Sequence, residues 1–396
     1  MVRVIHTADW HLGKSFSLFG DDVEKQSRLR QRRLEAVAGL GSLAKEHGAA
    51  AVLVAGDVFH SSTLPDRFVL QALDAIGKIG AAVVAIPGNH DHGGPGSIWQ
   101  RGVFREEQAR RAPNLTVLQD DPCVHVLRGA GEEALAKILA YPLKRRDAGV
   151  RLGAFGELLA GAEGDGLPLV GLVHAAVGTY GEDAGVRPLV GDAGVEAKLS
   201  YLALGDFHRT QRVEGLGCEA WYSGTLEPDK FPSHQQEGNS VGRCLLVEMS
   251  GRVRAGVREL DVPGSYRWDR RRRAVRSREE LEVLLSELEP FLRAPAGTVL
   301  MQLDLEGSEL DMESSERLGG VLERLGTCLL HLERIGEVQM RPREAELGGG
   351  TAAGGRAGAA AAALARELSG DLGGSRRRVV LSALERLHSL LRSGGG

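Results

Sequence analysis

The chain has 396 residues, of which 42% are hydrophobic, and a formal net charge of -4 at pH 7. This length and apolar content allow a large core and predict two or more folding units. The charge excludes a global positive field that would draw the protein to nucleic acid or acidic lipid, so any polyanion must be bound locally.

The sequence has no feature of a secreted or membrane protein. No segment reaches the roughly 18 consecutive apolar residues of a membrane helix, and no signal peptide is recognisable at the start. The four cysteines are far apart and show no pairing pattern. We therefore expect a reduced, cytoplasmic protein without a membrane partner.

Short β-rich runs and helical patterns alternate in the first part of the chain. Strands are predicted over residues 2–5, 51–55, 82–86, 167–173, 201–204 and 244–248, and helices over 25–46 and 67–79. Strands separated by helices need crossover connections. Polar side chains that follow such strands gather at their carboxyl ends, the edge of an α/β sheet where ligand sites usually form.

A second, smaller α/β unit is predicted over residues 275–345. Its expected elements are a helix over 277–292, a strand over 298–305, a helix over 308–325 and a strand over 328–340. The unit follows a basic run that could contact the phosphates of a DNA duplex or form a solvated linker. The run consists of Arg270, Arg271, Arg272 and Arg273.

The C-terminal part has a different composition. Residues 346–374 are dominated by Gly and Ala and predict a flexible linker, although 359–368 could form a helix. Residues 375–393 predict an amphipathic helix. Its apolar stripe consists of Val380, Leu384, Leu387 and Leu391. An isolated helix of this length is marginal in water, so we expect it to dock on its own domain or on a partner.

Five polar motifs follow the predicted strands of the first unit. Turn chemistry explains each one alone, since Gly, Asp and Asn suit turns, but it does not explain a histidine beside nearly every carboxylate or amide. The motifs are Asp9-Trp10-His11, Gly56-Asp57-Val58-Phe59-His60, Gly88-Asn89-His90-Asp91-His92, Gly171-Leu172-Val173-His174 and Gly205-Asp206-Phe207-His208.

The order of these motifs resembles that of the calcineurin-like metallophosphoesterases. Within that superfamily, residues 56–62 and 221–228 are similar to the DNA repair exonuclease branch that contains SbcD, whereas phosphoprotein phosphatases carry Asp-Arg-Gly at the first of these places. The likeness covers about residues 1–260. It implies an α/β fold, a four-layer αββα sandwich of two mixed sheets over residues 1–262, followed by a small α/β capping domain and a terminal helix.

The resemblance also implies two divalent metal ions at the strand ends. One ion would be held by Asp9, His11, Asp57 and His208, and the other by Asp57, Asn89, His174 and Asp206. Oxygen and imidazole donors of this mixture suit Mn(II) first, with Mg, Fe or Zn as alternatives. Such a pair of ions activates a water that attacks phosphorus and neutralises charge on the phosphate.

Two further histidines are implied to face the substrate. His90 follows a metal ligand directly, and the matching imidazole of the family stabilises the transition state or protonates the leaving oxygen. His60 could contact the phosphate or the nucleotide, or it could be a merely structural residue. One departure from the family lies at Asp206, where the nucleases usually carry histidine. Because Asp still coordinates metals, we expect a changed metal preference or affinity rather than loss of binding.

The leading interpretation is a hydrolase, a Mn-dependent DNA exonuclease and endonuclease of DNA repair. By resemblance, its partners are DNA and a coiled-coil ATPase of the SMC type, related to SbcC, on which the terminal helix could dock. Pairing of two copies stays open. One alternative is a phosphatase or a phosphodiesterase for cyclic nucleotides or other small molecules. The other is a scaffold that binds DNA or an ATPase and has weakened catalysis.

Overall fold

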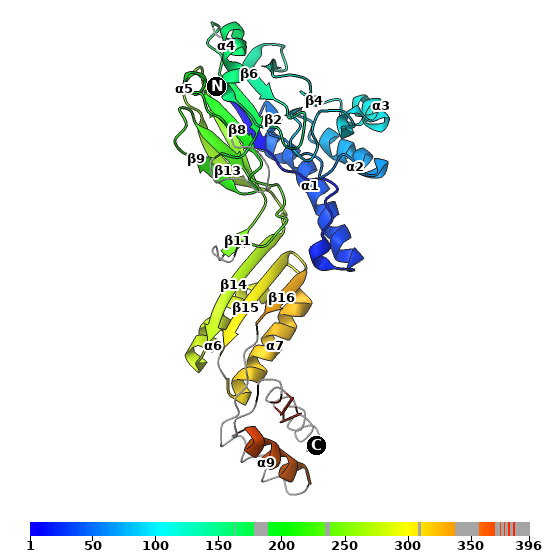
Figure 1. Cartoon of the computed structure of the whole chain (residues 1–396), viewed down its shortest axis with the longest axis vertical. Coiled ribbons are helices and arrows are strands. Elements are labelled where there is room, and N and C mark those ends of the chain that lie inside the picture. The colour runs from blue at the N-terminus through cyan, green and yellow to red at the C-terminus, as the bar shows by residue number, and fades with distance from the viewer. Residues whose placement is uncertain are drawn as a thin grey trace. The chain divides into compact units, whose positions relative to one another are not determined.

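A computed structural model of the chain describes residues 1–162, 164–177, 189–233, 238–307, 310–336 and 356–368, together with Gly373, Arg376, Val379, Val380, Ala383 and Leu384 (Figure 1). The chain divides into two compact units. The first comprises Met1–Lys230 and Ser240–Arg267, and the second comprises Phe231–Asn239 and Trp268–Gly396.

The first unit contains two mixed sheets of six strands each. The first sheet has the order β13-β12-β1-β2-β3-β4, and the second has the order β5-β6-β7-β8-β10-β9. The strands of the first are β1 (Val2–Thr7), β2 (Ala51–Val54), β3 (Ala82–Ala85), β4 (Leu115–Val117), β12 (Arg243–Met249) and β13 (Gly256–Asp261). The strands of the second are β5 (Cys123–Arg128), β6 (Ala134–Tyr141), β7 (Leu169–His174), β8 (Tyr201–Gly205), β9 (Thr210–Val213) and β10 (Ala220–Ser223).

The central strands of both sheets run parallel. β1, β2, β3 and β4 pair in parallel in the first sheet, as do β6, β7, β8 and β10 in the second. The flanking strands β12, β13, β5 and β9 are antiparallel to their neighbours. Every residue of β2 and β7 is buried, as expected for central parallel strands that are covered on both faces.

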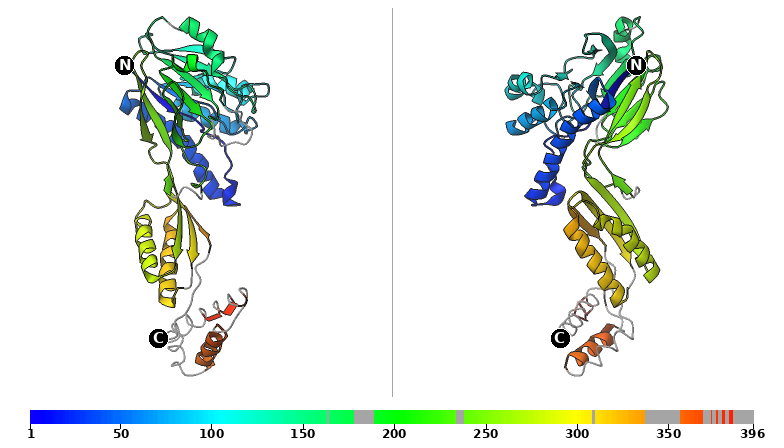
Figure 2. Two further views of the ribbon diagram at one scale, coloured as in Figure 1. Left: turned by 60° about the vertical axis from the view of Figure 1, so that its left-hand side comes forward. Right: turned by 180° about the vertical axis from the view of Figure 1, so that it is seen from behind.

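Helices cover the outer face of each sheet. They are α1 (Val23–His47), α2 (Asp66–Gly77), α3 (Gly102–Arg111), α4 (Gly156–Ala162) and α5 (Ala193–Glu196). One core joins α1, α2 and α3 to the first sheet, a second lies between the two sheets, and a third joins α4 and α5 to the second sheet (Figure 2). The predicted four-layer αββα sandwich is therefore confirmed. The described residues of the unit also form the 3-10 helices η1 (Ser17–Phe19), η2 (Ile98–Gln100) and η3 (Leu152–Phe155), and isolated bridges join Leu12 to Phe59 and Arg151 to Val190.

The second unit is built on one sheet of order β11-β14-β15-β16. Its elements are β11 (Gly238–Ser240), β14 (Arg267–Val275), α6 (Arg278–Leu292), β15 (Val299–Gly307), α7 (Met312–Cys328) and β16 (His331–Ile335). Apolar residues of α6 and α7 pack on β15 in a separate core. The predicted order of helices and strands is confirmed, with shifted bounds: β15 continues to Gly307, α7 runs from Met312 to Cys328, and β16 begins at His331. Residues 337–340 of the last predicted strand lie outside the described residues.

The basic run lies within strand β14 and is not a linker. Arg270 is buried and donates to the carbonyl of Pro232 at 3.2 Å. The other three guanidinium groups form ion pairs, Arg271 with Asp269 at 2.9 Å, Arg272 with Glu306, and Arg273 with Glu287 at 2.8 Å. Contact of this run with DNA stays a prediction, and three of its four arginines are already ion-paired with acidic residues of their own unit.

The C-terminal region contains one long described helix, α9 (Arg356–Leu368), within the stretch predicted as a linker. In the predicted terminal helix, Val380 and Leu384 are buried, so these two positions of the apolar stripe are covered by the chain itself. Leu387 and Leu391 lie outside the described residues. Within the described ranges, no helix combines the length and the hydropathy that a membrane span requires.

A buried histidine between the two sheets should make folding depend on pH. His6 of β1 is inaccessible to solvent, and its Nδ1 lies 2.8 Å from the hydroxyl of Tyr201. Burial lowers its pKa from 6.5 to about 3. The unfolded chain therefore binds a proton near pH 6.5 that the folded chain does not bind until about pH 3, so stability falls as the pH falls through this window.

We expect the free energy of unfolding to decrease by about 2 kcal/mol more for the unmodified chain than for His6→Asn between about pH 6 and pH 4.5. Urea unfolding of both proteins at the two pH values, in the presence of a chelator, measures this difference. Equal pH slopes would show that His6 does not carry the effect.

Candidate metal centre

The five polar motifs meet at one edge of the sandwich, where strands of both sheets end. β1, β2 and β3 of the first sheet and β7 and β8 of the second run parallel within their sheets, so each motif lies at the carboxyl end of its strand. Backbone hydrogen bonds fix the first two motif loops to each other, from Asp9 N to Gly56 O at 3.1 Å and from His11 N to Asp57 O at 2.9 Å. Hydrogen bonds from Asp206 N to both carboxylate oxygens of Asp9, each 3.2 Å, join the two sheets.

Positive φ angles concentrate in these loops. Among the described residues other than glycine, five have a positive φ, and four of them are predicted metal ligands: Asp9 (53°), His11 (44°), Asp57 (54°) and Asp206 (99°). A backbone held in this region costs roughly 1–3 kcal/mol per residue and persists only where the surrounding structure enforces it. Here the strain points four donor side chains toward one place.

Two glycines allow the donor groups to approach each other. A Cβ on Gly56, where φ is 92°, would lie 2.4 Å from His174 Nδ1, and a Cβ on Gly88 would lie 2.1 Å from Asp57 Oδ1. The Cβ on Gly88 would also lie 2.6 Å from the backbone nitrogen of Asp57, and the His174 ring is held by its hydrogen bond to Ala55, so any other residue at these positions would displace the predicted ligands. The glycines of the motifs therefore permit the turns and also leave room for the donor side chains to lie close together.

The first group of donors consists of Asp9, His11 and His208, whose ligand atoms all lie within 4.8 Å of one another. His11 Nε2 is 3.1 Å from His208 Nε2 and 3.7 Å from Asp57 Oδ2. Burial, followed by the nearby His208 and His90, lowers the pKa of His11 well below its ordinary value. His11 is therefore held in the neutral form that binds a metal.

The second group is arranged around His174. Its Nδ1 donates to the carbonyl of Ala55 at 2.8 Å. Nε2 lies 2.9 Å from Asn89 Oδ1, 3.6 Å from Asp57 Oδ2 and 3.9 Å from Asp206 Oδ1. Asp57 is thus within 4 Å of histidines of both groups, at the place of a bridging ligand.

Electrostatics favours a cation at this place. Asp9, Asp57 and Asp206 are all at most 3% exposed. Burial raises the pKa of Asp9 to about 7, and although burial lowers the pKa of His174, the three carboxylates raise it to about 9. The buried carboxylates thus favour a positive charge nearby. Divalent ions would supply more positive charge than a proton on His174 does. The residues present therefore fit a pair of metal ions.

The two predicted catalytic histidines lie beside the first group and are partly exposed. His90 N donates to Asp57 Oδ1 at 2.9 Å, and His90 Nδ1 donates to the carbonyl of His60 at 3.0 Å. The rings of His60 and His90 stack with centroids 4.9 Å apart, and His60 Nδ1 is 3.4 Å from His11 Nδ1. The structure thus brings all seven predicted ligands and both predicted catalytic residues into one cluster.

Sequence reasoning missed a carboxylate behind His208. Asp229 Oδ2 lies 3.3 Å from His208 Nδ1 and also forms an ion pair with Lys14. Burial would raise the pKa of Asp229, but His208, Lys14 and Arg33 together lower it well below its usual range. An ionised Asp229 fixes the His208 tautomer so that Nε2 faces the cluster. The only signal was its position directly after the 221–228 segment.

Two further residues that support the ligand loops, Asp91 and Arg33, were not predicted from the sequence. Asp91 accepts hydrogen bonds from Phe59 N at 3.0 Å and from Gly88 N at 2.7 Å, so it fastens the second motif loop to the third. Arg33 of α1 is buried and donates to the carbonyl of Trp10 at 2.7 Å. These contacts hold the ligand loops in their strained conformations.

The calcineurin-like phosphoesterase family model matches residues 2–209, just over half of the chain. The chain belongs to the calcineurin-like phosphoesterase family. The matched residues include all seven candidate ligands, and the predicted family resemblance is confirmed.

Curated relatives of this phosphoesterase include the D subunit of the SbcCD nuclease from two bacteria. The Bacillus subtilis protein is 26% identical over 57% of this chain and 61% of its own length, so the chain spans about six tenths of that relative. The Rhodobacter capsulatus protein is 28% identical over 66% of this chain and 69% of its own length. The solved structure of TT1561 from Thermus thermophilus matches 66% of this chain and 99% of its own at 13% identity, with a TM-score of 0.39.

Replacing Asp229 should weaken metal binding without removing a ligand. In Asp229→Asn the side chain keeps its size but loses its charge, so His208 is oriented less firmly, and we expect metal affinity to fall about 10- to 100-fold. Isothermal titration with Mn(II) measures the change. Asp261→Asn, which removes an exposed carboxylate on β13, should bind as the unmodified chain does. Equal affinities of the two variants would contradict the assigned role.

Proposed function

We propose that the chain is a metal-dependent phosphodiesterase that cuts DNA as an exonuclease and endonuclease in DNA repair. The observation that carries the proposal is Asp57, a buried carboxylate placed between two groups of imidazole, carboxylate and amide donors in a phosphoesterase family. The relatives named as nuclease subunits support DNA as the substrate, and the likeness of residues 56–62 and 221–228 to the nuclease branch supports it further.

Asp9, His11, Asp57 and His208 would hold one ion, and Asp57, Asn89, His174 and Asp206 the other. When bound, two such ions activate water and stabilise the charge that develops on a phosphate during in-line displacement. Mn(II) suits the donors best, with Mg, Fe or Zn as alternatives. Asp206 adds a hard anionic donor at a position where the related nucleases usually carry histidine.

The side chains around the ions position the substrate and supply the proton that the leaving oxygen takes up. His90 Nδ1 donates to the carbonyl of His60, so Nε2 is the ring nitrogen that would face a phosphate ester and, when protonated, would give its proton to the leaving oxygen. Burial, followed by the nearby His90 and Lys14, lowers the pKa of His60 to about 4, so this ring is neutral at neutral pH. It can donate a hydrogen bond to the phosphate but carries no charge to neutralise it.

Two other functions compete with this proposal. A phosphatase or small-molecule phosphodiesterase could use the same centre, and a scaffold could keep the fold while Asp206 weakens catalysis. Incubation of the purified chain with Mn(II) and single-stranded DNA, duplex DNA or bis(p-nitrophenyl) phosphate separates them. We expect cleavage of DNA. Intact DNA with hydrolysis of the small ester would favour the first alternative, and no hydrolysis would favour the second.

Two substitutions test the assignment of residues within this proposal. Asp57→Ala should abolish metal binding and all cleavage, because it removes a ligand of both ions. His90→Ala should bind Mn(II) normally and lose about 100-fold or more in turnover, the usual effect of losing a general acid. Titration with Mn(II) and single-turnover cleavage measure the two effects. His47→Ala on α1 is a control, and normal cleavage by His90→Ala would refute its catalytic role.

We infer that a coiled-coil ATPase of the SMC type is the protein partner, since the relatives are named as one subunit of a larger nuclease. The terminal helix is the proposed docking element. Deletion of residues 375–396 should greatly reduce capture of the ATPase in a pull-down assay. The deletion also removes the buried side chains of Val380 and Leu384. The double substitution Leu387→Asp/Leu391→Asp keeps both of them and therefore provides a milder second test. Undiminished capture by both variants would exclude this docking mode.

A further inference from the structure

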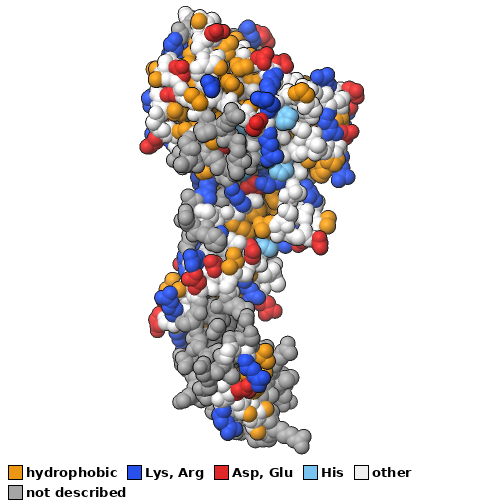
Figure 3. All heavy atoms as spheres, in the orientation of Figure 1, with side chains coloured by type: hydrophobic (Ala, Val, Ile, Leu, Met, Phe, Trp, Pro, Cys, Tyr) orange, Lys and Arg blue, Asp and Glu red, His pale blue; other side chains and the backbone are white. Residues whose placement is uncertain are grey.

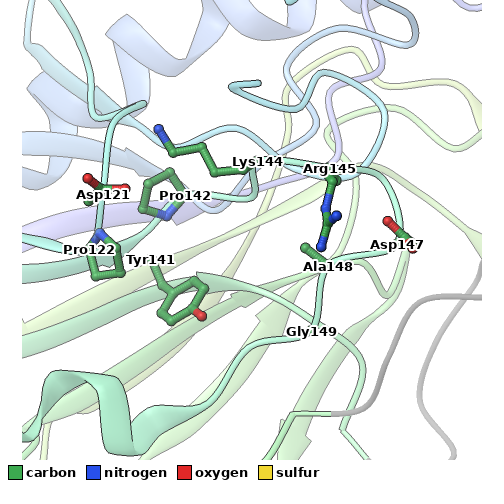
Figure 4. Close-up of a pocket in the computed structure, with 9 residues that line it drawn as sticks. All are labelled: Asp121, Pro122, Tyr141, Pro142, Lys144, Arg145, Asp147, Ala148 and Gly149. Carbon is green, nitrogen blue, oxygen red and sulfur yellow. The ribbon is translucent and has the colours of Figure 1, made fainter. Parts of the chain in front are cut away.

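A pocket of about 390 Å³ opens near the carboxyl end of β6, in the first unit. Figure 4 shows Pro122 and Tyr141 on one side of it and Arg145, Asp147 and Ala148 on the other. The segment that follows β6 supplies most of its lining, and Asp121 completes the rim. The metal centre uses none of these residues.

The pocket is joined directly to the loops of the metal centre. Tyr141 pairs with Val173, the residue before the candidate ligand His174. Leu143 N donates to Pro87 O at 3.3 Å, and Gly93 N donates to Leu143 O at 2.7 Å. The segment that lines the pocket therefore runs along the loop that carries Asn89 and His90.

The lining itself holds two cations, Lys144 and Arg145, and two acids, Asp121 and Asp147, but the segment that supplies most of it is basic. Residues 141–151 contain Lys144, Arg145, Arg146 and Arg151 but only one acid, Asp147. Within the described part of the chain, the side chains of Lys144 and Arg145 have no ion-pair partner. Figure 3 shows Lys and Arg side chains beside exposed histidines on one face of the first unit. Unlike the arginines of β14, these two cations remain available to an anion.

Tyr141 adds an aromatic surface to these charges. Its ring is half-buried and packs edge-on against Phe155 with centroids 6.1 Å apart, which holds it in place. A fixed aromatic ring beside unpaired cations is the combination that binds single-stranded nucleic acid, since a base stacks on the ring while phosphates meet the cations. A paired base of a duplex cannot stack in this way.

Resting on the DNA cleavage proposed above, we propose that this pocket is a binding subsite for unpaired DNA next to the metal centre. Tyr141 stacks on a base, and Lys144 and Arg145 contact the neighbouring phosphates. The subsite gives the enzyme a preference for DNA whose strand is already separated near the cleavage site. It binds the backbone and any base face, and it has no means to select a sequence.

The test compares the full chain with Lys144→Gln/Arg145→Gln and with the control pair Lys78→Gln/Arg105→Gln, which removes the same charge near α2 and on α3. Fluorescence anisotropy with a labelled single-stranded oligonucleotide gives Kd at several salt concentrations. We expect about tenfold weaker binding for the pocket pair and a log-log salt slope that is smaller by about 1.4, the value for two phosphate contacts on a single strand. The control pair should lose much less affinity, and its salt slope should change less.

Substitutions of the ring separate stacking from charge. Tyr141→Leu should weaken single-strand binding about tenfold and leave duplex binding nearly unchanged, whereas Tyr141→Phe should bind as the unmodified chain does. The KM for single-stranded DNA should rise in Tyr141→Leu, while kcat and hydrolysis of bis(p-nitrophenyl) phosphate stay constant. Melting temperatures of the variants identify any loss of folding, and the charge pair provides the test if Tyr141→Leu does not fold.

The outcomes separate the subsite from the function on which it rests. If the unmodified chain cuts DNA and the pocket pair matches the control pair in affinity and salt slope, the subsite is refuted and the nuclease function stands. If duplex binding falls as far as single-strand binding, the preference for unpaired DNA is refuted. If the unmodified chain neither binds nor cuts DNA, both proposals fail.

Discussion

Mutual repulsion of buried carboxylates is the constraint on which the rest of this structure depends. Asp9, Asp57 and Asp206 are gathered with hardly any exposure to water, in a medium where like charges repel strongly. Burial raises the pKa of Asp9, and the three carboxylates raise the pKa of His174, so bound protons offset part of this negative charge. Three buried carboxylates this close together destabilise a folded chain. The arrangement is therefore favourable only when cations are part of the native state.

The surrounding fold supplies the rigidity that this cluster requires. Parallel strands buried on both faces end at one place, and hydrogen bonds between their loops hold four nonglycine residues at positive φ. Asp91 and Arg33 add fixed contacts from behind, so the strained loops cannot relax outward. The stability of the sandwich thereby offsets the strain at its edge, where donor atoms are held close together before any ion arrives.

The sequence predicted much of this because its signals were local. Apolar runs followed by Asp, Asn and His marked the strands and the ligands, and alternation of helices and strands marked the second unit. Asp229 was not predictable in the same way, because its role depends on the direction of a side chain 21 positions away from His208. The position of the arginines in strand β14 was not predicted, for another reason. Long charged side chains cover apolar surface with their stems and conceal the alternation that marks a strand.

Metal and substrate must be coupled in a protein with this distribution of charge. The chain is negative overall, three arginines of β14 are ion-paired with acidic residues, and the centre without cations holds three buried carboxylates. A polyanion is therefore repelled by the carboxylates when no cation is bound, and it is attracted once cations neutralise them. Each ion that binds improves the site for a phosphate, and by linkage each phosphate that binds must strengthen the hold on the ions. In the proposed function, the attraction of a phosphate ester thus depends on the same carboxylates that repel one another when no cation is bound.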